Sequence, residues 1–568
     1  MRYIFFYSII LFCSCNTAEQ KGNSTTSSTE NGETIVRTDT IYLTKNVEVT
    51  PANSYSDLFL DSSTVESFIK SKKLSDDEAK GFRSFYNYRN LQYAWFSSLG
   101  LTDQAKGFWN LQDKYGTKAD KALRNKMDTL LNMDTLIISR FDTSLVNTEL
   151  SLTHSWLQFY KANRSKTLFA NLSPEKAIPV KKENAVSLAD TLQAQGSDSS
   201  GGNRLSQYFL LKQKLQTYNS IAKQGGWRTI IFNSKQVKKG SSSPNVTLIK
   251  RRLQMTGDMN GTDSSTVFND SLVTAVKNYQ QRNGMKPSGI ITDTLIRSLN
   301  VPVDKRIQQI IINLNRMQWM AASQDATYIS VNIPDYKLYA FENNAKVFEM
   351  PVVVGKEGAN TTMFSGNIDQ IVFSPYWNIP SGIVKNEIMP KVMADPNYLK
   401  SKNMEIVGKN DSVPTIRQLP GKDNALGKVK FLFPNRYDIY LHDTYAKEIF
   451  KKDVRATSHG CIRLADAEKM ANYLLRNNSA WTPEKVNAAM NSGKEQYVKL
   501  SPAMPVTITY FTTWVDENGL LNFRDDVYSN DKKISQMMFG NNVLPAPSSP
   551  VNAANDSIQK KNTLRKKK

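Results

Sequence analysis

The chain has 568 residues, of which 40% are hydrophobic and 10% aromatic. These values exclude a wholly disordered protein, and the length is too great for one hydrophobic core, so several folded domains are expected. The net charge of +21 suits a protein that works among anionic membrane or wall polymers. Since no zinc-finger, basic-zipper or RNA-binding signature accompanies this charge, no nucleic acid is expected as a partner.

The N-terminus reads MRYIFFYSIILFCSCN, in which Arg2 precedes an apolar stretch and small residues lead to Cys15. This order is typical of a short secretory signal, and the stretch is too short to span a bilayer as a mature helix. Its end resembles a bacterial lipobox, although Phe12 stands where leucine is usual. Residues 1–14 are therefore expected to be a lipoprotein signal peptide, the alternative being an uncleaved short anchor. The resemblance implies an exported protein that is lipid-anchored through Cys15 in the bacterial cell envelope and faces the periplasm.

Cysteine use follows from this interpretation. The chain has three cysteines, Cys13, Cys15 and Cys461. Removal of the signal takes away the first and lipidation occupies the second, so Cys461 becomes the only free thiol of the mature chain. A lone thiol in an exported protein is either buried and inert or retained for its chemistry.

The first half of the mature chain is predicted to be a tether followed by helices. Residues 15–53 are rich in Ser, Thr, Asn and Glu, which predicts a flexible tether that begins at the lipidated cysteine. Residues 54–240 carry aromatic and aliphatic residues at spacings of three and four, which predicts a helical scaffold domain. His154 is alone on one such helical pattern and is interpreted as a structural residue.

A different pattern occupies residues 245–300, where two helical segments, a glycine-containing turn and a third helix follow one another. The arrangement resembles the small three-helix peptidoglycan-binding module. Because the shared positions are mainly core and turn residues, the resemblance implies a fold rather than a proven binding activity. Tyr279 and Ser288 replace the usual Phe and Asp. The positions that match are Leu253, Gln254, Gly257, Asp270, Ala275, Val276, Tyr279, Gln280, Gly284, Gly289, Asp293, Leu299 and Asn300.

Strands are predicted in the second half, after a connecting helix over residues 301–325. In YISVNIP the polar and apolar residues alternate, as in a half-buried strand, and a Pro-Asp break and the turn ENNA separate the strands that follow. Residues 326–528 are expected to form one mainly-β domain. Its irregular, partly helical segment at about 381–428 is interpreted as an inserted lid. The fold class expected for the whole chain is thus multidomain α+β, and residues 540–568 are expected to form a basic disordered tail.

A cysteine-centred site is predicted at the stretch TSHGCIRLAD. A free thiol has a pKa of about 8.5 and attacks poorly until a histidine or a positive field favours the thiolate. The helical pattern that begins at LADAEK predicts a helix N-terminus just after Cys461, where the helix dipole favours a thiolate. Gly460 allows close backbone approach and an amide N–H that faces an oxyanion. Arg463 supplies a planar cation suited to a carboxylate.

The partner of this cysteine is left open by the residues alone. His459, two positions before Cys461, is the obvious choice of base. In YDIYLHD, strand alternation places Tyr440 and His442 on one face, which makes His442 a second candidate 19 positions upstream. A zinc site is not expected, because two histidines and one cysteine lack paired ligand spacing.

SHGCIRL, preceded by YLHDT, resembles the active-site signature of the L,D-transpeptidases, the YkuD-type cysteine enzymes of bacterial cell walls. Similarity extends from Tyr328 to Arg476, and the helical region, the three-helix module and the insertion together resemble the large lid-containing branch of the family. Met363 departs from it, because the segment NTTMF has methionine where proline is common. The signature positions present are His442, Ser458, His459, Gly460, Cys461, Ile462 and Arg463.

The resemblance implies Cys461 as the nucleophile and His442 as the general base, with the imidazole oriented by the backbone carbonyl of Asp443. Oxyanion or substrate contacts are implied for His459, Gly460, Tyr440, Ser458 and Arg463. No cofactor and no metal are implied.

The implied reaction is acyl transfer from a peptidoglycan tetrapeptide stem, with release of the terminal D-alanine, to an amine of a second stem. The product is a 3→3 cross-link, and stem peptides are both donor and acceptor. Carbapenem-type inhibitors are implied ligands. Three alternatives remain: an L,D-carboxypeptidase that uses water, a ligase that joins a protein to peptidoglycan, and a non-catalytic wall-binding scaffold.

Overall fold

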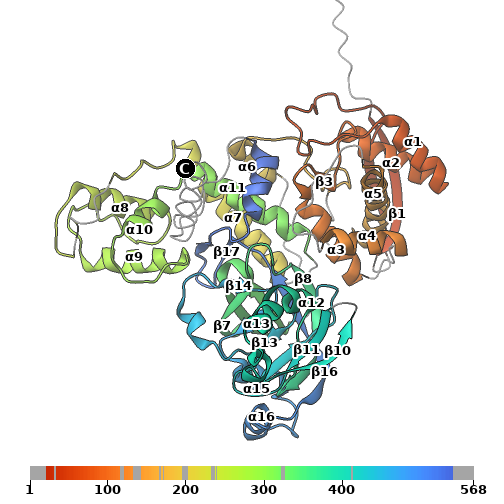
Figure 1. The fold of residues 1–568 in the computed structure, drawn as a ribbon. Coiled ribbons are helices and arrows are strands. Elements are labelled where there is room, and N and C mark those ends of the chain that lie inside the picture. Colours follow the sequence, from red (N-terminus) through yellow and green to blue (C-terminus); the bar gives the residue numbers. More distant parts are fainter. Residues whose placement is uncertain are drawn as a thin grey trace, which may run out of the picture. The chain divides into compact units, whose positions relative to one another are not determined.

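The computed structural model describes most of the chain between residues 21 and 540 (Figure 1). The predicted signal peptide, Cys15 and all of the predicted basic tail after Gly540 lie outside the described residues. The described part has gaps at 31–32, 116–119, 132–141, 165–167, 170–171, 195–202, 232–236, 238, 321–325 and 411–412.

The chain divides into two compact units. The first comprises Met1–Gly100, Ile137–Ser165 and Phe169–Lys182. Its core is built from aromatic side chains, among which Trp156 packs against Trp95 and Phe169. The helical region expected here is confirmed. Its elements are β1 (Lys21–Glu30), β2 (Glu33–Tyr42), α1 (Ser62–Lys72), α2 (Asp76–Tyr88), β3 (Phe96–Ser97), β4 (Gly100–Leu101) at the border of the unit, and α5 (Thr143–Asn163).

A hairpin stands where the sequence predicted a flexible tether. β1 and β2 are antiparallel, with Lys21 opposite Tyr42 and Glu30 opposite Glu33. The prediction from composition overlooked the Asn-Gly pair between the two arms, which is a strong sequence signal for a two-residue hairpin, and the β-branched residues of ETIVRTDTIY. The end of β2 is tied to the helical core, because the Tyr42 N–H donates to Ser84 Oγ at 3.1 Å.

The second unit begins with four helices and continues into the three-helix module. α3 (Asp103–Tyr115), α4 (Lys121–Leu131), α6 (Ala185–Ala194) and α7 (Asn203–Lys223) precede α8 (Pro244–Met255), α9 (Asp270–Arg282) and α10 (Asp293–Leu299). The last three enclose the core of the module. Two of its motif residues are joined by a hydrogen bond, because Gln280 Oε1 accepts the backbone N–H of Gly289 at 2.8 Å. Gly289 has φ +73°, and a Cβ there would lie 2.8 Å from Val273 Cγ1.

Helix α11 (Val303–Gln318) is buried along most of its length and connects the module to the strands. Its Arg316 forms ion pairs with Asp103 and Asp531 and donates to the carbonyl of Tyr510. Asp531 belongs to α17 (Asn530–Phe539), which packs against α11 beyond the predicted end of the β domain. One buried guanidinium therefore joins α3, α11, α17 and the end of a strand.

The C-terminal part is built on a nine-stranded sheet in the order β14-β7-β15-β13-β12-β8-β16-β5-β6, and β6 also pairs with β7. The mainly-β domain expected from the sequence is thus confirmed. Helices α15 (Ala467–Leu475) and α16 (Pro483–Met490) contribute to its core. The strands are β5 (Tyr328–Asn332), β6 (Lys337–Glu342), β7 (Ala345–Gly355), β8 (Phe364–Phe373), β12 (Val429–Leu432), β13 (Leu441–His442), β14 (Ala456–Ser458), β15 (Ile462–Leu464) and β16 (Gln496–Thr509), with a separate hairpin of β17 (Thr513–Val515) and β18 (Leu521–Phe523).

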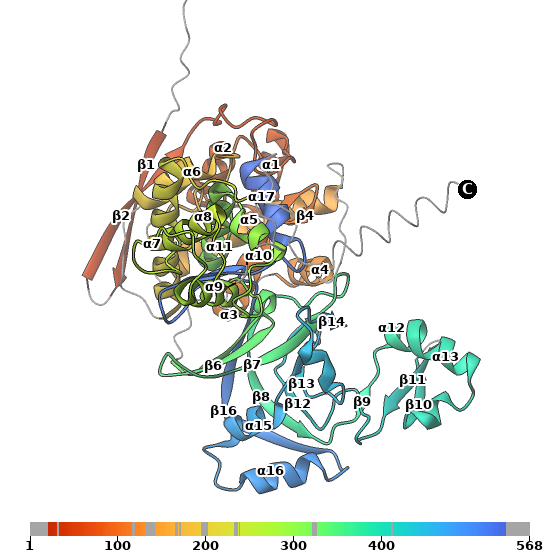
Figure 2. The same ribbon diagram turned by 90° about the vertical axis from the view of Figure 1, so that its left-hand side faces the viewer.

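The segment predicted to be a lid has a small sheet and a core of its own. In Figure 2 its helices α12 and α13 lie beside β10 and β11. Ile379, Val384, Ile388 and Ile416 form its buried centre. Its elements are β9 (Trp377–Asn378), α12 (Ser381–Ile383), the π-helix η4 (Val384–Ile388), α13 (Met389–Ala394), α14 (Tyr398–Ser401), β10 (Met404–Asn410) and β11 (Val413–Gln418).

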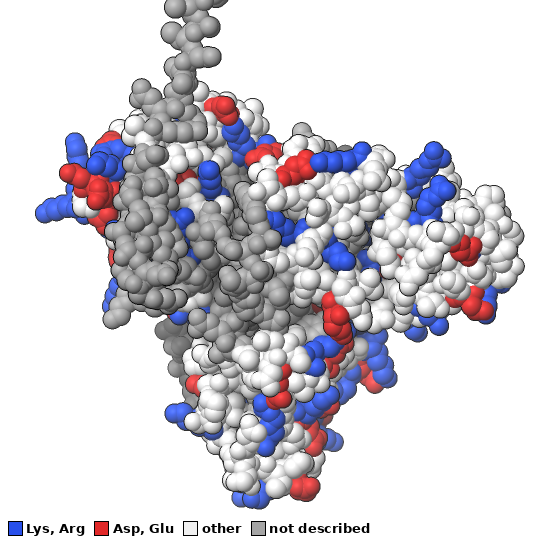
Figure 3. All heavy atoms as spheres, turned by 180° about the vertical axis from the view of Figure 1, so that it is seen from behind, with Lys and Arg blue, Asp and Glu red and all other residues white. Residues whose placement is uncertain are grey.

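The surface carries charges of both signs. On the face shown in Figure 3, Lys and Arg side chains are scattered and interspersed with Asp and Glu, without one dominant basic patch. Among the described residues, no helix combines the length and apolarity needed to cross a membrane.

The buried Arg316 cluster leads to a first prediction. Arg316→Ala leaves two carboxylates without their cation in a site where Arg316 is 4% exposed, so it should lower the free energy of unfolding by about 3–5 kcal/mol. Arg83→Ala is the matched control, since Arg83 and Glu66 are both 45% exposed, and it should lower the free energy by about 0–1 kcal/mol. Urea unfolding followed by near-UV circular dichroism measures both, and equal effects would contradict the assignment.

Candidate active site

Two short parallel strands bring the predicted site residues together. β13 pairs with β15 so that Leu441 lies opposite Ile462 and His442 opposite Arg463. The Ile462 N–H donates to the carbonyl of Tyr440 at 3.1 Å, which fixes the register at the ends of both strands. Segments 19 residues apart in sequence are thereby adjacent in the sheet, with Tyr440 and Cys461 at the same end.

His442 is held by the backbone in one tautomer. The side chain is buried, and its Nδ1 lies 2.5 Å from the carbonyl oxygen of Asp443. A carbonyl can only accept a hydrogen bond, so Nδ1 carries the proton and Nε2 is left as the proton acceptor. This is the contact that the family resemblance implies for Asp443. The carboxylate of Asp443 accepts from the Lys428 N–H at 2.9 Å and pairs with Lys447 at 2.6 Å.

Burial keeps this imidazole neutral. Burial lowers the pKa of His442 to about 3, and the nearby charge of Arg463 acts in the same direction, against the opposing effect of the Asp443 carbonyl. At neutral pH the ring therefore carries no charge. Tyr440 lies next to it, with 5.6 Å between the two ring centroids.

Cys461 is half-buried and rests as a thiol. Burial raises the pKa of Cys461, while hydrogen bonds from the N–H and the hydroxyl of Tyr440 act in the opposite direction. The Sγ lies 3.6 Å from the carbonyl oxygen of Asp438. The donors of Tyr440 would stabilise a thiolate once it forms, yet the resting pair of Cys461 and His442 is neutral.

The prediction that a helix dipole favours the thiolate of Cys461 is wrong. The sequence predicted a helix N-terminus just after Cys461, but β15 lies between, and α15 begins only at Ala467 with Asp466 as its N-cap. The effect of a helix terminus falls off within its first turn, so α15 does not lower the pKa of this thiol. The error arose because the three residues Ile462–Leu464 are too few for a strand pattern to be recognised.

The loop before the cysteine is held by hydrogen bonds that involve its own backbone. Ser458 Oγ donates to the carbonyl of Cys461 at 2.6 Å and accepts the Gly460 N–H at 3.2 Å. The Gly460 N–H thus binds Ser458 in this structure, and its contact with an oxyanion stays a prediction. Gly460 itself has φ +114°, which L side chains rarely adopt.

Threonine and tyrosine residues far away in sequence complete this support. Thr361 Oγ1 donates to the carbonyl of Gly460 at 2.7 Å and accepts the Gly355 N–H at 2.9 Å. The hydroxyl of Tyr528 donates to the carbonyl of Gly355 at 2.6 Å. Sequence analysis singled out neither residue: Thr361 stands in the segment NTTMF, but it lies 99 positions before Gly460, and only the tertiary fold brings it to the loop.

His459 points to the lid segment. Its Nε2 lies 2.7 Å from Glu387 Oε1, and the two side chains are 40% and 42% exposed. Glu387 belongs to η4, and π-helical turns are frequent at functional sites. Nε2 of His459 is thus engaged by a carboxylate of the lid segment.

Arg463 contributes charge at close range. It is half-buried, burial lowers its pKa, and its Nε is buried without a hydrogen-bond partner among the described residues. Its charge lowers the pKa of both His442 and Cys461. The cation therefore favours a neutral imidazole and a developing thiolate at the same time.

The thiol environment leads to a prediction on reactivity. An ordinary cysteine has a pKa of about 8–9. The rate of alkylation of Cys461 by iodoacetamide should rise with pH around a midpoint above this range, because burial raises the pKa of its thiol. Tyr440→Phe should move the midpoint higher, since the hydroxyl hydrogen bond that lowers the pKa is lost. Peptide-resolved mass spectrometry follows the label on Cys461. Tyr497→Phe is the control, because its hydroxyl bonds Glu495 instead, and a lower midpoint in Tyr440→Phe would refute the assignment.

The buried histidine leads to a prediction on stability. Its ordinary pKa of 6.5 applies to the unfolded chain and falls to about 3 on folding. Above pH 6.5 neither state binds this proton, whereas between 6.5 and 3 only the unfolded state does, so stability is lost as pH falls through this window. In His442→Gln this loss is absent. The Tm of the parent minus that of the variant should decrease from about pH 7.5 to about pH 4.5; a constant difference would show that His442 titrates normally.

Comparison with known proteins agrees with this geometry. Residues 326–508 match the family described as the L,D-transpeptidase catalytic domain, YkuD. Residues 242–299 match the "Putative peptidoglycan binding domain" family, and residues 80–215 match a scaffold domain family.

Among curated proteins, a "Putative L,D-transpeptidase" of Haemophilus influenzae is 29% identical over 244 residues, which are 40% of this chain and 49% of that protein. The chain thus matches about half the length of this relative. Similar solved structures include an L,D-transpeptidase from Mycobacterium smegmatis, with 12% identity, a TM-score of 0.17 and coverage of 32% of this chain and 58% of that one. L,D-transpeptidase 3 from Mycobacterium tuberculosis in complex with a faropenem-derived adduct has 14% identity, a TM-score of 0.17 and coverage of 32% and 60%.

Proposed function

We propose that this chain, which carries a YkuD L,D-transpeptidase catalytic domain and a peptidoglycan-binding domain, forms 3→3 cross-links between peptidoglycan stems with Cys461 as nucleophile. The observation that carries the proposal is the parallel register of β13 and β15. It brings a buried imidazole, hydrogen-bonded through Nδ1 to the carbonyl of Asp443, and a half-buried thiol to adjacent strand ends of the matched domain.

In the first step, Sγ of Cys461 attacks the carbonyl carbon of the third stem residue. Nε2 of His442 takes the thiol proton and delivers it to the amine of the departing D-alanine as the C–N bond breaks, which leaves a thioester. Because the pKa of the thiol is raised and that of the imidazole lowered, proton transfer must accompany the attack rather than precede it.

The Gly460 N–H, which binds Ser458 Oγ at 3.2 Å, is one candidate donor to the developing oxyanion, and a second donor would strengthen the site. The hydroxyl of Tyr440 is suited to this role, since it already lies against Cys461 Sγ. In the second step, an amine of another stem attacks the thioester, His442 accepts the amine proton, and the C–S bond breaks as the thiol is restored. An acceptor approaches past Glu387 and His459, which join the lid segment to the cysteine loop.

The cellular setting belongs to the same proposal. We infer an exported protein that is lipid-anchored through Cys15 in the cell envelope and faces the periplasm, on the strength of the N-terminal sequence MRYIFFYSIILFCSC. A carbapenem is proposed as an acylating inhibitor of Cys461, because similar structures include an Enterococcus faecium catalytic domain acylated by ertapenem, with 10% identity and a TM-score of 0.17.

The central test follows the acyl group. Cys461→Ala should abolish new stem dimers, and His442→Gln should slow their formation by roughly 10²–10⁴-fold because the proton acceptor is lost. His154→Gln is the matched control, since this histidine contacts Gln158 and Phe68 in the first unit. Purified tetrapeptide stems are the substrate, and intact-protein and muropeptide mass spectrometry reveal the thioester and the products.

The same measurement separates the alternatives. Tripeptides without dimers would indicate an L,D-carboxypeptidase, and stems joined to protein lysines would indicate a protein-to-peptidoglycan ligase. A chain that takes up neither a stem nor a carbapenem at Cys461 would be a wall-binding scaffold, and the proposed function would fail. Protein purified from membranes should also show the mass of a lipid on Cys15.

A further inference from the structure

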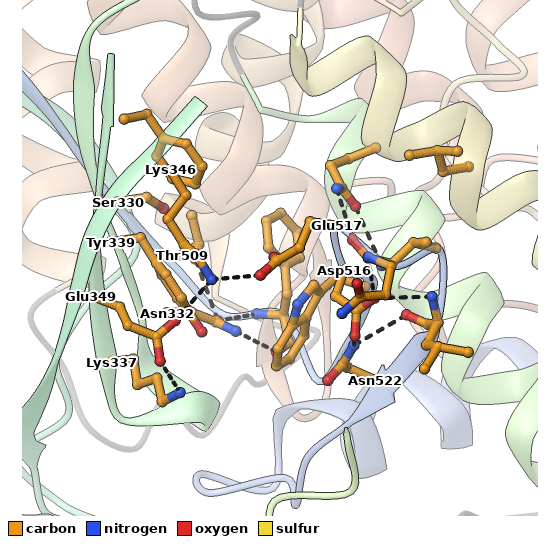
Figure 4. A pocket seen from close by; sticks show the side chains of 18 of the residues that line it. Ser330, Asn332, Lys337, Tyr339, Lys346, Glu349, Thr509, Asp516, Glu517 and Asn522 are labelled. Carbon is orange, nitrogen blue, oxygen red and sulfur yellow. Dashed lines mark hydrogen bonds and ion pairs between the residues drawn. The ribbon is translucent and has the colours of Figure 1, made fainter. Parts of the chain in front are cut away.

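A groove of about 960 Å³ lies away from Cys461, against the outer face of β5 and β6 (Figure 4). Its volume is near the upper end of the range for ligand pockets, about 300–1,000 Å³, so it has room for more than one sugar ring. The β17–β18 hairpin forms a second wall, and α9 of the peptidoglycan-binding domain lines a third side through Asn278 and Gln281.

The floor of the groove is a ladder of cross-strand pairs. Tyr328 lies opposite Phe341, Ser330 opposite Tyr339, and Asn332 opposite Lys337. These residues share the face of the sheet that looks away from its core, as strand alternation requires. The rings of Tyr328 and Phe341 stack on each other with their centroids 4.7 Å apart, so the floor carries aromatic side chains beside polar ones.

Trp514 supplies a second aromatic surface on the hairpin. The ring is half-buried in the groove wall and is backed by the guanidinium of Arg524, 4.9 Å from its centroid. An ion pair between Lys346 on β7 and Glu517 on the hairpin, 2.8 Å long, connects the two walls. Aromatic rings on two sides with amides between them suit a ligand that has both apolar and hydroxyl faces.

The charges of the groove are satisfied within the protein. Lys337 pairs with Glu349 at 2.5 Å, and Lys346 pairs with both Glu349 and Glu517. Arg282 and Arg524 pair with Asp258 and Asp335. Since each of the four lining cations already has a carboxylate partner, the groove is not built for a polyanion. A peptide added as a further strand does not fit here, because β6 is already paired on both sides, with β5 and β7.

We propose that this groove binds a glycan strand of N-acetylated amino sugars, the polymer that carries the stem peptides. The C–H groups on one face of a pyranose ring pack against the negative face of an aromatic ring. Exposed Asn278 and Gln281 can bond the acetamido groups and hydroxyls. This inference rests on the proposed function for the identity of the polymer, and it assigns a wall-binding surface that the catalytic sheet shares with the peptidoglycan-binding domain.

The test uses the full chain with Cys461→Ala, so that binding is measured without turnover. The probe is glycan strands from which an amidase has removed all stem peptides, titrated by calorimetry. Trp514→Ala should raise the Kd about tenfold because a stacking surface is lost. Ser330→Trp should have a similar effect by filling the floor while leaving the rings in place. Tyr497→Ala, an exposed tyrosine on β16 outside the groove, should leave the Kd unchanged.

The outcomes are distinct. No binding of peptide-free strands, or equal binding by the parent and both groove variants, would overturn the proposal, as would displacement of the strands by inorganic polyphosphate. If Trp514→Ala fails to fold, as seen in its thermal unfolding, Ser330→Trp decides the question. Acyl transfer between soluble stems by the chain with Cys461 intact is measured separately, so glycan binding without acyl transfer would support the groove and reject the proposed reaction.

Discussion

The parallel pairing of β13 with β15 is the constraint on which the site depends. Parallel strands cannot be joined by a tight turn, so the chain between His442 and Cys461 needs a longer crossover. It crosses to the edge of the same sheet, where the short β14 pairs with the end of β7 and leads into the cysteine loop. The backbone pairing of the sheet therefore sets the positions of His442 and Cys461. Contacts between the two side chains are not what brings them together.

The electrostatic state of the site follows from the same placement. Strands in the middle of a sheet are shielded from water, and burial disfavours the charged form of an ionisable group. Burial therefore lowers the pKa of His442 and raises that of Cys461. A thiolate–imidazolium pair at rest would require the opposite shifts. Both groups are therefore neutral at rest in this structure.

Sequence patterns predicted a helical N-terminal region, a three-helix module and a β-rich C-terminal domain, and the structure confirms all three. Strand alternation placed Tyr440 and His442 on one face, and helical spacing located the three-helix module. The pairing of His442 with Cys461 came from family resemblance, because nothing local specifies which strands become neighbours. For the same reason Thr361 and Glu387 escaped detection, since each reaches the cysteine loop through a contact that only the tertiary fold creates. Two local patterns were misjudged: a three-residue strand was too short to interrupt the helix prediction, and an Asn-Gly pair was overlooked in a polar segment.

The double pairing of β6 has a consequence for the fate of the whole chain. An open sheet presents unpaired N–H and C=O groups that can recruit strands of other molecules. Here β6 closes against β7, and the short β14, of three residues, lies beside the last two residues of β7. The nine-stranded sheet therefore offers little unpaired backbone to a second molecule. Other molecules therefore find few free strand edges on this sheet at which aggregation could begin.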